Sequence, residues 1–202
     1  ALALSNELNL LRPDSTAVFQ ADITDTNEAN SLIHDFNSWA GGIDLLINNA
    51  SSFYPTPIGT ITDDQWHDLM GSNLKGPLFI TQAASSALRK AKGSVINLID
   101  IHTRSPLKNH PVYGSAKAGL KMLTRSLAKD LAPEIRVNGI SPGAILWPED
   151  GMTDDIKEDI LNKIPLRRIG SPQDIADCVL FLLYKADYIT GQIIAVDGGR
   201  SV

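Results

Sequence analysis

Two residues in the middle of the chain have the types and spacing for acid–base chemistry. Tyr113 and Lys117 are four positions apart, so on a helix they would share one face. A free phenol is a weak acid at neutral pH, but a neighbouring ammonium favours the phenolate and lowers its pKa. A tyrosine tuned in this way can donate a proton while a hydride reaches an adjacent carbon. The same spacing also arises by chance on many helices, so the pair needs further support.

Asp100 is a third candidate, because it stands thirteen residues before Tyr113 at the end of an apolar run. A carboxyl group can accept hydrogen bonds from ring N–H groups and, when protonated, can donate to ring nitrogens. This suits reduction of a C=N bond, in which nitrogen rather than oxygen receives the proton. There are two alternatives. The acid could have no role in the reaction, or it could be turned to solvent while the neighbouring Ser105 acts in its place.

The segments around these residues alternate between strand and helix patterns. Short apolar runs predict strands at 16–23, 43–50, 93–100, 135–143 and 192–199. Helical patterns cover 1–11, 27–39, 62–92, 113–131, 153–163 and 172–184, with a bend expected near Gly76-Pro77. Strands separated by helices of this length predict one α/β domain over residues 1–202, a doubly wound, Rossmann-like parallel sheet.

Composition excludes several classes of function. The net charge is −5 with no basic stripe, so we expect no nucleic-acid partner. No apolar stretch reaches the ~18 residues of a membrane span, and the first residues do not resemble a secretory signal. No metal-ligand cluster is visible. The single cysteine, Cys178, falls in an apolar helical pattern as a core residue, which fits a cytoplasmic location.

Ligands of doubly wound sheets bind outside the carboxyl ends of the strands. The residues that follow predicted strands are therefore the candidates for binding. They are Asp22, Asn48–Ser52, Asp100 and Ser141–Ile145.

Five motifs in order support a family resemblance. IDLLINNA, NLKG, the Tyr113-x-x-x-Lys117 pair, VNGISPG and ITGQIIAVDGG follow one another along the chain. From about residue 16 onward the sequence resembles the short-chain dehydrogenase/reductase family. The resemblance implies that Tyr113 is the proton donor, Lys117 its pKa tuner and a ligand of the nicotinamide ribose. It implies that Asn73 binds a water molecule and maintains the geometry of the active-site helix.

The resemblance also implies a set of cofactor contacts. They are Asp22, Ile23, Asn49, Ala50, Ser51, Tyr113, Lys117, Pro142, Gly143 and Ile145. Taken singly, several of these residues have structural alternatives. Asn49 could tie a strand end to a turn, Asp22 could cap the next helix, and Gly143 could serve only a tight turn.

Two departures from the common pattern point to one branch of the family. Asp100 stands where most members have serine, and SSFYPTP (51–57) follows Asn-Asn-Ala where glycine is common. Both features resemble the pteridine reductases. This implies that Phe53 is an aromatic platform stacked on a pterin, opposite the nicotinamide; the alternative is an ordinary loop hydrophobe. Residues 142–152 would form the substrate loop, with Trp147 as a pterin contact, a lid contact or part of a subunit interface. The implied substrate-binding set is Ser51, Phe53, Asp100, Tyr113 and Trp147.

The glycine-rich turn TGxxxGxG that should cradle the cofactor diphosphate is not in this sequence. We therefore expect the N-terminal β-α-β portion of the fold, roughly ~45 residues, to be absent from this chain. The cofactor implied by the resemblance is NADPH, with NAD not excluded. In the family that the sequence resembles, the helices at 62–92 and 113–131 pair across two-fold axes, so the resemblance implies a homotetramer.

The sequence thus predicts NADPH-dependent reduction of a dihydropterin or dihydrofolate-type ring. The first alternative is a short-chain reductase of a ketone such as a 3-oxoacyl thioester. The second is a non-catalytic, truncated relic of the fold. His102 and His110 receive no chemical role.

Overall fold

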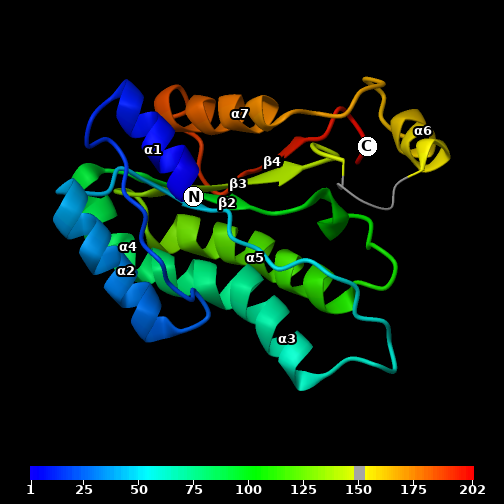
Figure 1. The fold of residues 1–202 in the computed structure, drawn as a ribbon, viewed down its shortest axis with the longest axis horizontal. Helices are drawn as coiled ribbons and strands as arrows, with labels where there is room; N and C mark the ends of the chain where they lie inside the picture. Colours follow the sequence, from blue (N-terminus) through cyan, green and yellow to red (C-terminus); the bar gives the residue numbers. More distant parts are fainter. Residues whose placement is uncertain (148–152) are drawn as a thin grey trace.

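A parallel sheet organises the computed structural model, which describes residues 1–147 and 153–202 (Figure 1). Its described strands are β1 (Leu45–Asn48), β2 (Ser94–Leu98), β3 (Arg136–Pro142) and β4 (Ile193–Val196). They lie in the order β1-β2-β3-β4, and every neighbouring pair is parallel. The predicted α/β fold with a parallel, Rossmann-like sheet is confirmed.

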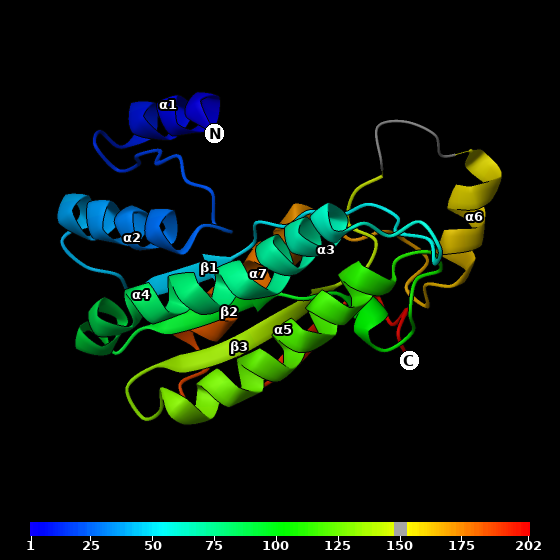
Figure 2. The ribbon, with the colours of Figure 1, turned by 90° about the horizontal axis from the view of Figure 1, so that it is seen from below.

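Helices cover both faces of this sheet (Figures 1 and 2). On one face α4 and α5 pack on β1 to β3, and α2 packs on α4, whereas α7 packs on β3 and β4 from the other face. The described helices are α1 (Leu2–Leu11), α2 (Thr26–Ala40), α3 (Asp63–Met70), α4 (Gly76–Ala91), α5 (Pro111–Asp130), α6 (Asp154–Asn162) and α7 (Pro172–Tyr184). None of them is long and apolar enough to cross a membrane.

The core is divided by the sheet into two apolar clusters. Val95 of β2 packs with Leu88 of α4 on one side, while the next residue, Ile96, packs with Leu182 of α7 on the other. This follows from the alternation of side chains along a strand. Because both faces of β2 are buried, its sequence reads as a continuous apolar run rather than as an alternating one. Cys178, predicted as a core residue, packs against the α7 cluster but is only partly buried.

One polar chain crosses this apolar interior. Asn48 and Asn97 are paired across β1 and β2, and the Asn48 side-chain amide donates to Asn97 Oδ1 at 2.8 Å. Asn97 in turn donates to the hydroxyl of Thr124 on α5 at 2.9 Å. These side chains are buried, so each requires its partner. These hydrogen bonds fix the ends of β1 and β2 relative to α5, close to the candidate site.

The predicted strand at 16–23 is wrong. Its residues form no strand, and β1 pairs only with β2 among the described strands. A strand requires a neighbour with which to exchange ladder hydrogen bonds, and no described strand lies beside this segment. It is instead held by local contacts. Asn9 Oδ1 accepts from the amides of Ser15 and Thr16, and Phe19 packs edge-on against Phe36 of α2.

The helical pattern at 62–92 is interrupted where a bend was expected. α3 begins with a capping box between Thr62 and Gln65, and α4 carries Pro77 in its first turn. Proline has no backbone N–H to continue the hydrogen-bond ladder. Residues Gly71–Lys75 between the two helices form a π-helical turn, a feature that often marks functional sites.

Asn97→Ala should remove one buried partner from both Asn48 and Thr124, which would keep only their bonds to Thr81 and to the Leu120 carbonyl. We expect the free energy of unfolding to fall by about 2–4 kcal/mol, measured by urea denaturation. Asn27→Ala is the control, because Asn27 is an exposed asparagine of α2. A loss for Asn97→Ala no larger than that of the control would show that the buried chain contributes nothing to stability.

Candidate active site

The predicted acid–base residues meet at the carboxyl end of β2. The Tyr113 hydroxyl, on the first turn of α5, donates to Asp100 Oδ2 at 2.7 Å. The other carboxylate oxygen of Asp100 accepts from the His102 amide at 2.7 Å and caps the short 3-10 turn Ile101–Thr103. Asp100 is therefore turned toward Tyr113 and held from two sides. The alternative in which it faces solvent is wrong.

Lys117 lies one turn beyond Tyr113 on the same face of α5, as its spacing predicts. Its side chain is buried, and Nζ donates to the Leu98 carbonyl at 2.9 Å. An ammonium carries three protons, so two remain for a ligand. A donor set of this kind fits a ribose diol, which is what the family resemblance expects at this position.

The predicted tuning of the tyrosine is wrong in direction. Burial, together with the charge of Asp100 and the hydrogen bond to it, raises the pKa of Tyr113 well above its ordinary value. Nζ of Lys117 lies 5.8 Å from the centre of the Tyr113 ring, whereas the carboxylate touches the hydroxyl. Burial also lowers the pKa of Lys117 to about 8. Burial is the largest cause of the Tyr113 shift, and the nearer charge, that of Asp100, acts in the same direction.

Asn73 anchors the loop that carries the predicted platform. It lies in the π-helical turn, is fully buried, and its Oδ1 accepts from the Ser51 hydroxyl at 2.7 Å. Its amide donates to the carbonyls of Ser52 at 2.9 Å and Leu69 at 3.0 Å. The structure therefore places Asn73 and Ser51 together, as a tie between the 51–57 loop and the helix. The role of Asn73 in holding a water stays a prediction.

Phe53 lies beside Tyr113. The two rings meet edge to face with centroids 4.9 Å apart, and 56% of Phe53 is exposed. One face of Phe53 is stacked on the imidazole of His110 at 4.8 Å, with an interplanar angle of 13°. Ring stacking requires flat, accessible surface, and Phe53 has it beside the Tyr113–Asp100 pair.

Three of the residues predicted to bind the cofactor line one pocket. Ile23, Asn49 and Ala50 border a cavity of about 250 Å³ between β1, α2 and α4. Asp22 is exposed, and its carboxylate accepts from the Thr24 amide at 2.8 Å. The cap of α2 is Asp25 rather than Asp22, so the alternative in which Asp22 caps the helix is wrong.

The turn after β3 packs closely on the end of β4. The Gly143 amide donates to the Val196 carbonyl at 3.0 Å, and a Cβ at Gly143 would lie 2.7 Å from Asp197 Cα. Glycine is therefore required by this approach of two backbones, while Pro142 ends β3 immediately before it. Trp147 is half-buried, and among the described residues the ring of Tyr113 pairs with that of Phe53 and not with that of Trp147. The rest of the predicted substrate loop, 148–152, lies outside the described residues.

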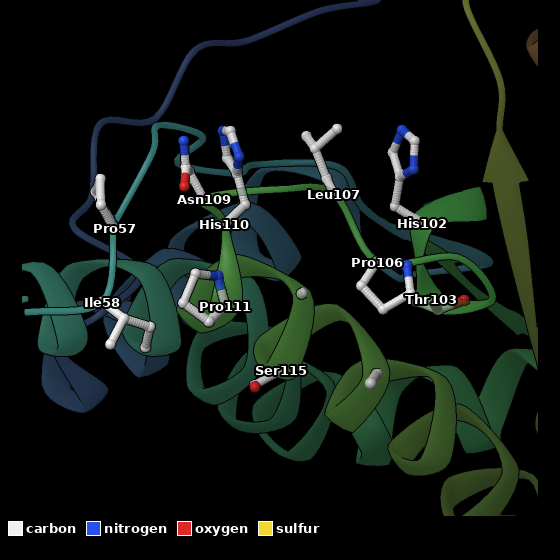
Figure 3. Close-up of a pocket in the computed structure, with 12 residues that line it drawn as sticks. Pro57, Ile58, His102, Thr103, Pro106, Leu107, Asn109, His110, Pro111 and Ser115 are labelled. Atoms are coloured by element: carbon white, nitrogen blue, oxygen red, sulfur yellow. The ribbon is translucent and has the colours of Figure 1, made fainter.

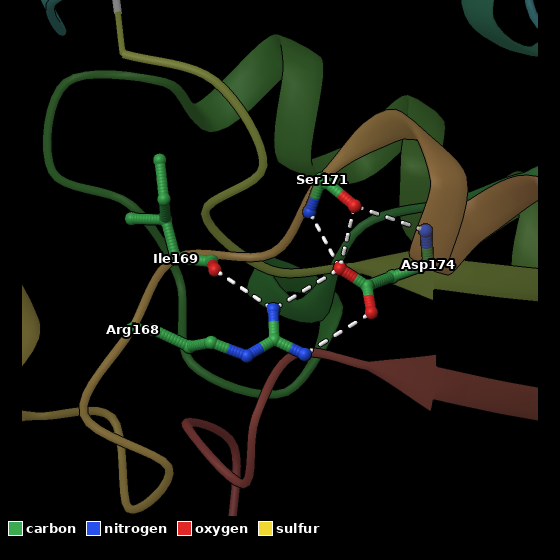
Figure 4. Close-up of polar contacts among 4 residues, drawn as sticks. All are labelled: Arg168, Ile169, Ser171 and Asp174. Atoms are coloured by element: carbon green, nitrogen blue, oxygen red, sulfur yellow. Dashed lines mark hydrogen bonds and ion pairs between the residues drawn. The ribbon is translucent and has the colours of Figure 1, made fainter.

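Two further contacts hold the segment that follows this turn. Figure 4 shows the second of them, between Arg168 and Asp174. The Gly170 amide donates to the Ala144 carbonyl at 2.8 Å. Beside it, both guanidinium nitrogens of Arg168 contact the two carboxylate oxygens of Asp174 at 3.1 Å. Asp174 also pairs with Ser171 in the capping box of α7, and these bonds hold the pKa of Asp174 well below its usual range. Together these contacts join the turn that contains Ile145 to the start of α7.

Sequence reasoning missed two contributors. Asp68 of α3 accepts from the hydroxyls of Tyr54 at 2.8 Å and Ser52 at 3.0 Å, so it supports the platform loop. His110 occupies the N-cap position of α5, and its side chain stacks on Phe53. Its position three residues before Tyr113 was the one available signal.

His110 also borders a cavity of about 640 Å³ over the start of α5 (Figure 3). Within the described residues, no group of His, Cys, Asp and Glu side chains could hold a metal ion.

Comparison with known proteins decides the family. The sequence model described as enoyl-(acyl carrier protein) reductase, of the short-chain type, matches residues 5–201. The chain belongs to the short-chain dehydrogenase/reductase family. It is therefore an oxidoreductase by family.

Two curated relatives are similar to almost the same extent. Pteridine reductase 1 of Leishmania tarentolae is 36% identical over 244 residues, which cover 100% of this chain and 84% of the relative. A 3-oxoacyl-(acyl-carrier-protein) reductase of Staphylococcus aureus (strain MW2) is 37% identical over 203 residues, which cover 98% of this chain and 82% of the relative. A solved structure of a putative short-chain alcohol dehydrogenase from Sinorhizobium meliloti 1021 superposes with a TM-score of 0.85. It is 33% identical and covers 90% of this chain and 75% of that chain.

The lowered pKa of Lys117 predicts a dependence of stability on pH. Between pH 8 and pH 10.5 the native lysine has lost its proton while the unfolded lysine still holds one. The unfolded state then binds more protons, so this group makes the free energy of unfolding rise with pH, by at most about 3 kcal/mol. Below pH 8 the group contributes no slope.

The measurement is urea denaturation of the natural protein and of Lys117→Met at pH 7.5, 9 and 10.5. Because other groups also titrate in this range, the quantity of interest is the difference between the two proteins. It should shift in favour of the natural protein as pH rises. A constant difference would show that the lysine is not held in a desolvated site.

Proposed function

We propose that this short-chain reductase transfers a hydride from NADPH to a ring carbon of a dihydropterin or dihydrofolate-type substrate, with a proton to ring nitrogen. The observation that supports it is the hydrogen bond between Tyr113 and Asp100, 2.7 Å long, beside the exposed ring of Phe53. A carboxyl group, a hydroxyl and an aromatic surface at one place match a flat heterocycle that presents ring nitrogens.

Tyr113 and Asp100 have different roles in this proposal. Burial, the charge of Asp100 and the hydrogen bond to it raise the pKa of Tyr113, so the phenol on its own gives up its proton reluctantly. In the proposed reaction Tyr113 passes its proton to the substrate nitrogen while Asp100 accepts hydrogen bonds from substrate N–H groups, and the phenolate then regains a proton from solvent. In the dihydropterin that arrives, a C=N bond accepts hydride at carbon and proton at nitrogen, so the reduction balances.

NADPH, when bound, supplies the hydride. Lys117 would hold its ribose with the two protons that Leu98 does not use. The residues proposed to line the rest of the cofactor are Asp22, Ile23, Asn49, Ala50, Ser51, Pro142, Gly143 and Ile145. A diphosphate cradle of the glycine-rich type is not in this sequence, so the preference for NADPH over NAD is supported only by the resemblance to pteridine reductases.

Reduction of a 3-oxoacyl thioester is the second candidate, and the relative from Staphylococcus aureus favours it. That reaction delivers the proton to a ketone oxygen. The family assignment favours either reductase over a non-catalytic relic. A cytoplasmic homotetramer that pairs through α4 and α5 completes the proposal.

Substrate choice is tested by steady-state kinetics with NADPH and three substrates: dihydrobiopterin, dihydrofolate and acetoacetyl coenzyme A. We expect kcat/KM for one of the two pterins to exceed that for the thioester by at least about tenfold. A preference for the thioester would replace the pterin proposal with the second candidate.

The roles of Tyr113 and Asp100 are tested by Tyr113→Phe and Asp100→Ser. Loss of the hydroxyl should lower kcat by about 10²–10⁴-fold, the usual contribution of a general acid. Asp100→Ser should reduce pterin turnover far more than it weakens NADPH binding, measured by fluorescence titration. Equal losses in turnover and in cofactor binding would show that Asp100 serves the structure, and full activity of Tyr113→Phe would remove the tyrosine from the reaction.

A further inference from the structure

His110 has a place in the site that the proposed reaction does not explain. It is the N-cap residue of α5, yet its side chain makes no capping hydrogen bond and stacks on Phe53 instead. We propose that His110 is a positioning residue that backs Phe53, so that the opposite face of the Phe53 ring is presented to a flat heteroaromatic substrate. This inference rests on the proposed function, because it assigns Phe53 to the substrate.

The imidazole is itself fixed by the backbone. Nδ1 of His110 lies 2.7 Å from the Lys108 carbonyl oxygen. A carbonyl can only accept, so Nδ1 must carry the proton in this contact. The His110 carbonyl accepts from the Gly114 amide at 2.9 Å, which places the residue at the start of α5. Ring orientation therefore follows from two backbone contacts and does not depend on a ligand.

The loop that carries Phe53 is held on both sides of that residue. Ser51 and Ser52 are bound to Asn73, and the Thr56 amide donates to the Asn109 carbonyl at 2.6 Å. Asn109 has a φ of 62°, in the left-handed region that asparagine tolerates better than most residues. The second tie thus reaches the residue next to His110. Backbone bonds bring the loop to the imidazole, and the stack then orients the ring.

Phe53 needs this support because it is largely exposed. The residue is 56% exposed, and its ring meets that of Tyr113 in a T-shaped contact with an interplanar angle of 78°. Without the imidazole, the ring could adopt other side-chain rotamers, and substrate binding would then have to select one of them. An aromatic pair of this kind changes an equilibrium by roughly 2- to 12-fold beyond the effect of buried area.

His102 offers a matched control on the same segment. Figure 3 shows the side chains of His102 and His110 projecting to the same side of residues 102–111, with Leu107 between them. Nδ1 of His102 also faces a backbone carbonyl, that of Ser105 at 3.2 Å. Among the aromatic contacts of the described chain, however, only His110 of these two stacks on a ring.

The test compares His110→Ala, His110→Phe and His102→Ala in the full chain with saturating NADPH. We expect His110→Ala to raise KM for the dihydropterin by roughly 5- to 12-fold, with kcat within about threefold and KM for NADPH unchanged. His110→Phe keeps an aromatic ring against Phe53 and should restore KM to within about twofold. His102→Ala keeps the backbone amide that holds Asp100 and removes a side chain that stacks on no ring, so KM for the dihydropterin should stay within about twofold of its natural value. Thermal melting checks that all variants are folded.

Three outcomes would overturn the inference: an unchanged KM in His110→Ala, a failure of His110→Phe to restore it, or an equal rise in His102→Ala. A natural protein that reduces no pterin would refute the proposed function instead, and the stack can then be tested without substrate. The His110 ring protons should show an upfield ring-current shift in NMR spectra that Phe53→Leu removes. Identical shifts in both proteins would show that the two rings are not stacked.

Discussion

The hydrogen bond between Tyr113 and Asp100 is the contact on which the site depends. It joins the first turn of α5 to the end of β2, and so requires that helix and strand keep one relative position. The buried chain from Asn48 through Asn97 to Thr124 supplies that constraint a short way below. Buried polar groups of this kind are costly when one partner is lost, so they specify a single arrangement. The relative positions of Tyr113 and Asp100 therefore depend on hydrogen bonds buried beside the sheet.

The same contact changes how the proton chemistry must be understood. Tyr-x-x-x-Lys suggests an acid made stronger by a cation, but the carboxylate lies closer to the hydroxyl than the ammonium does to the ring. Lys117 also donates one hydrogen bond to the Leu98 carbonyl, and burial lowers the pKa of Lys117 to about 8. Burial is the largest cause of both shifts, because it disfavours the charged form of the phenol and of the amine alike. The spacing of Tyr113 and Lys117 therefore does not by itself describe the acid.

Periodicity predicted the elements of this fold well where an element has a described neighbour. The strand at residue 94 and the helix at 172–184 follow directly from apolar runs and capping residues. The segment 16–23 is also rich in apolar and β-branched residues, but no described strand pairs with it, and composition cannot supply a pairing partner. The direction of the tyrosine pKa failed for a related reason. Spacing along a helix places Lys117, whereas the distance to Asp100 depends on the tertiary structure. The His110 stack was invisible for the same reason.

The identity of the residue at position 100 bears on substrate choice in a way that similarity does not. Ketone reduction builds negative charge on oxygen, and an ionised carboxylate beside the proton donor opposes that charge. A pterin presents ring N–H groups and an exocyclic amine, which a carboxylate accepts readily. The two relatives differ by one percentage point in identity, so overall similarity cannot separate the two reactions. For the proposed function, the acid in contact with Tyr113 gives a nitrogen heterocycle a hydrogen-bond acceptor that a ketone oxygen could not use.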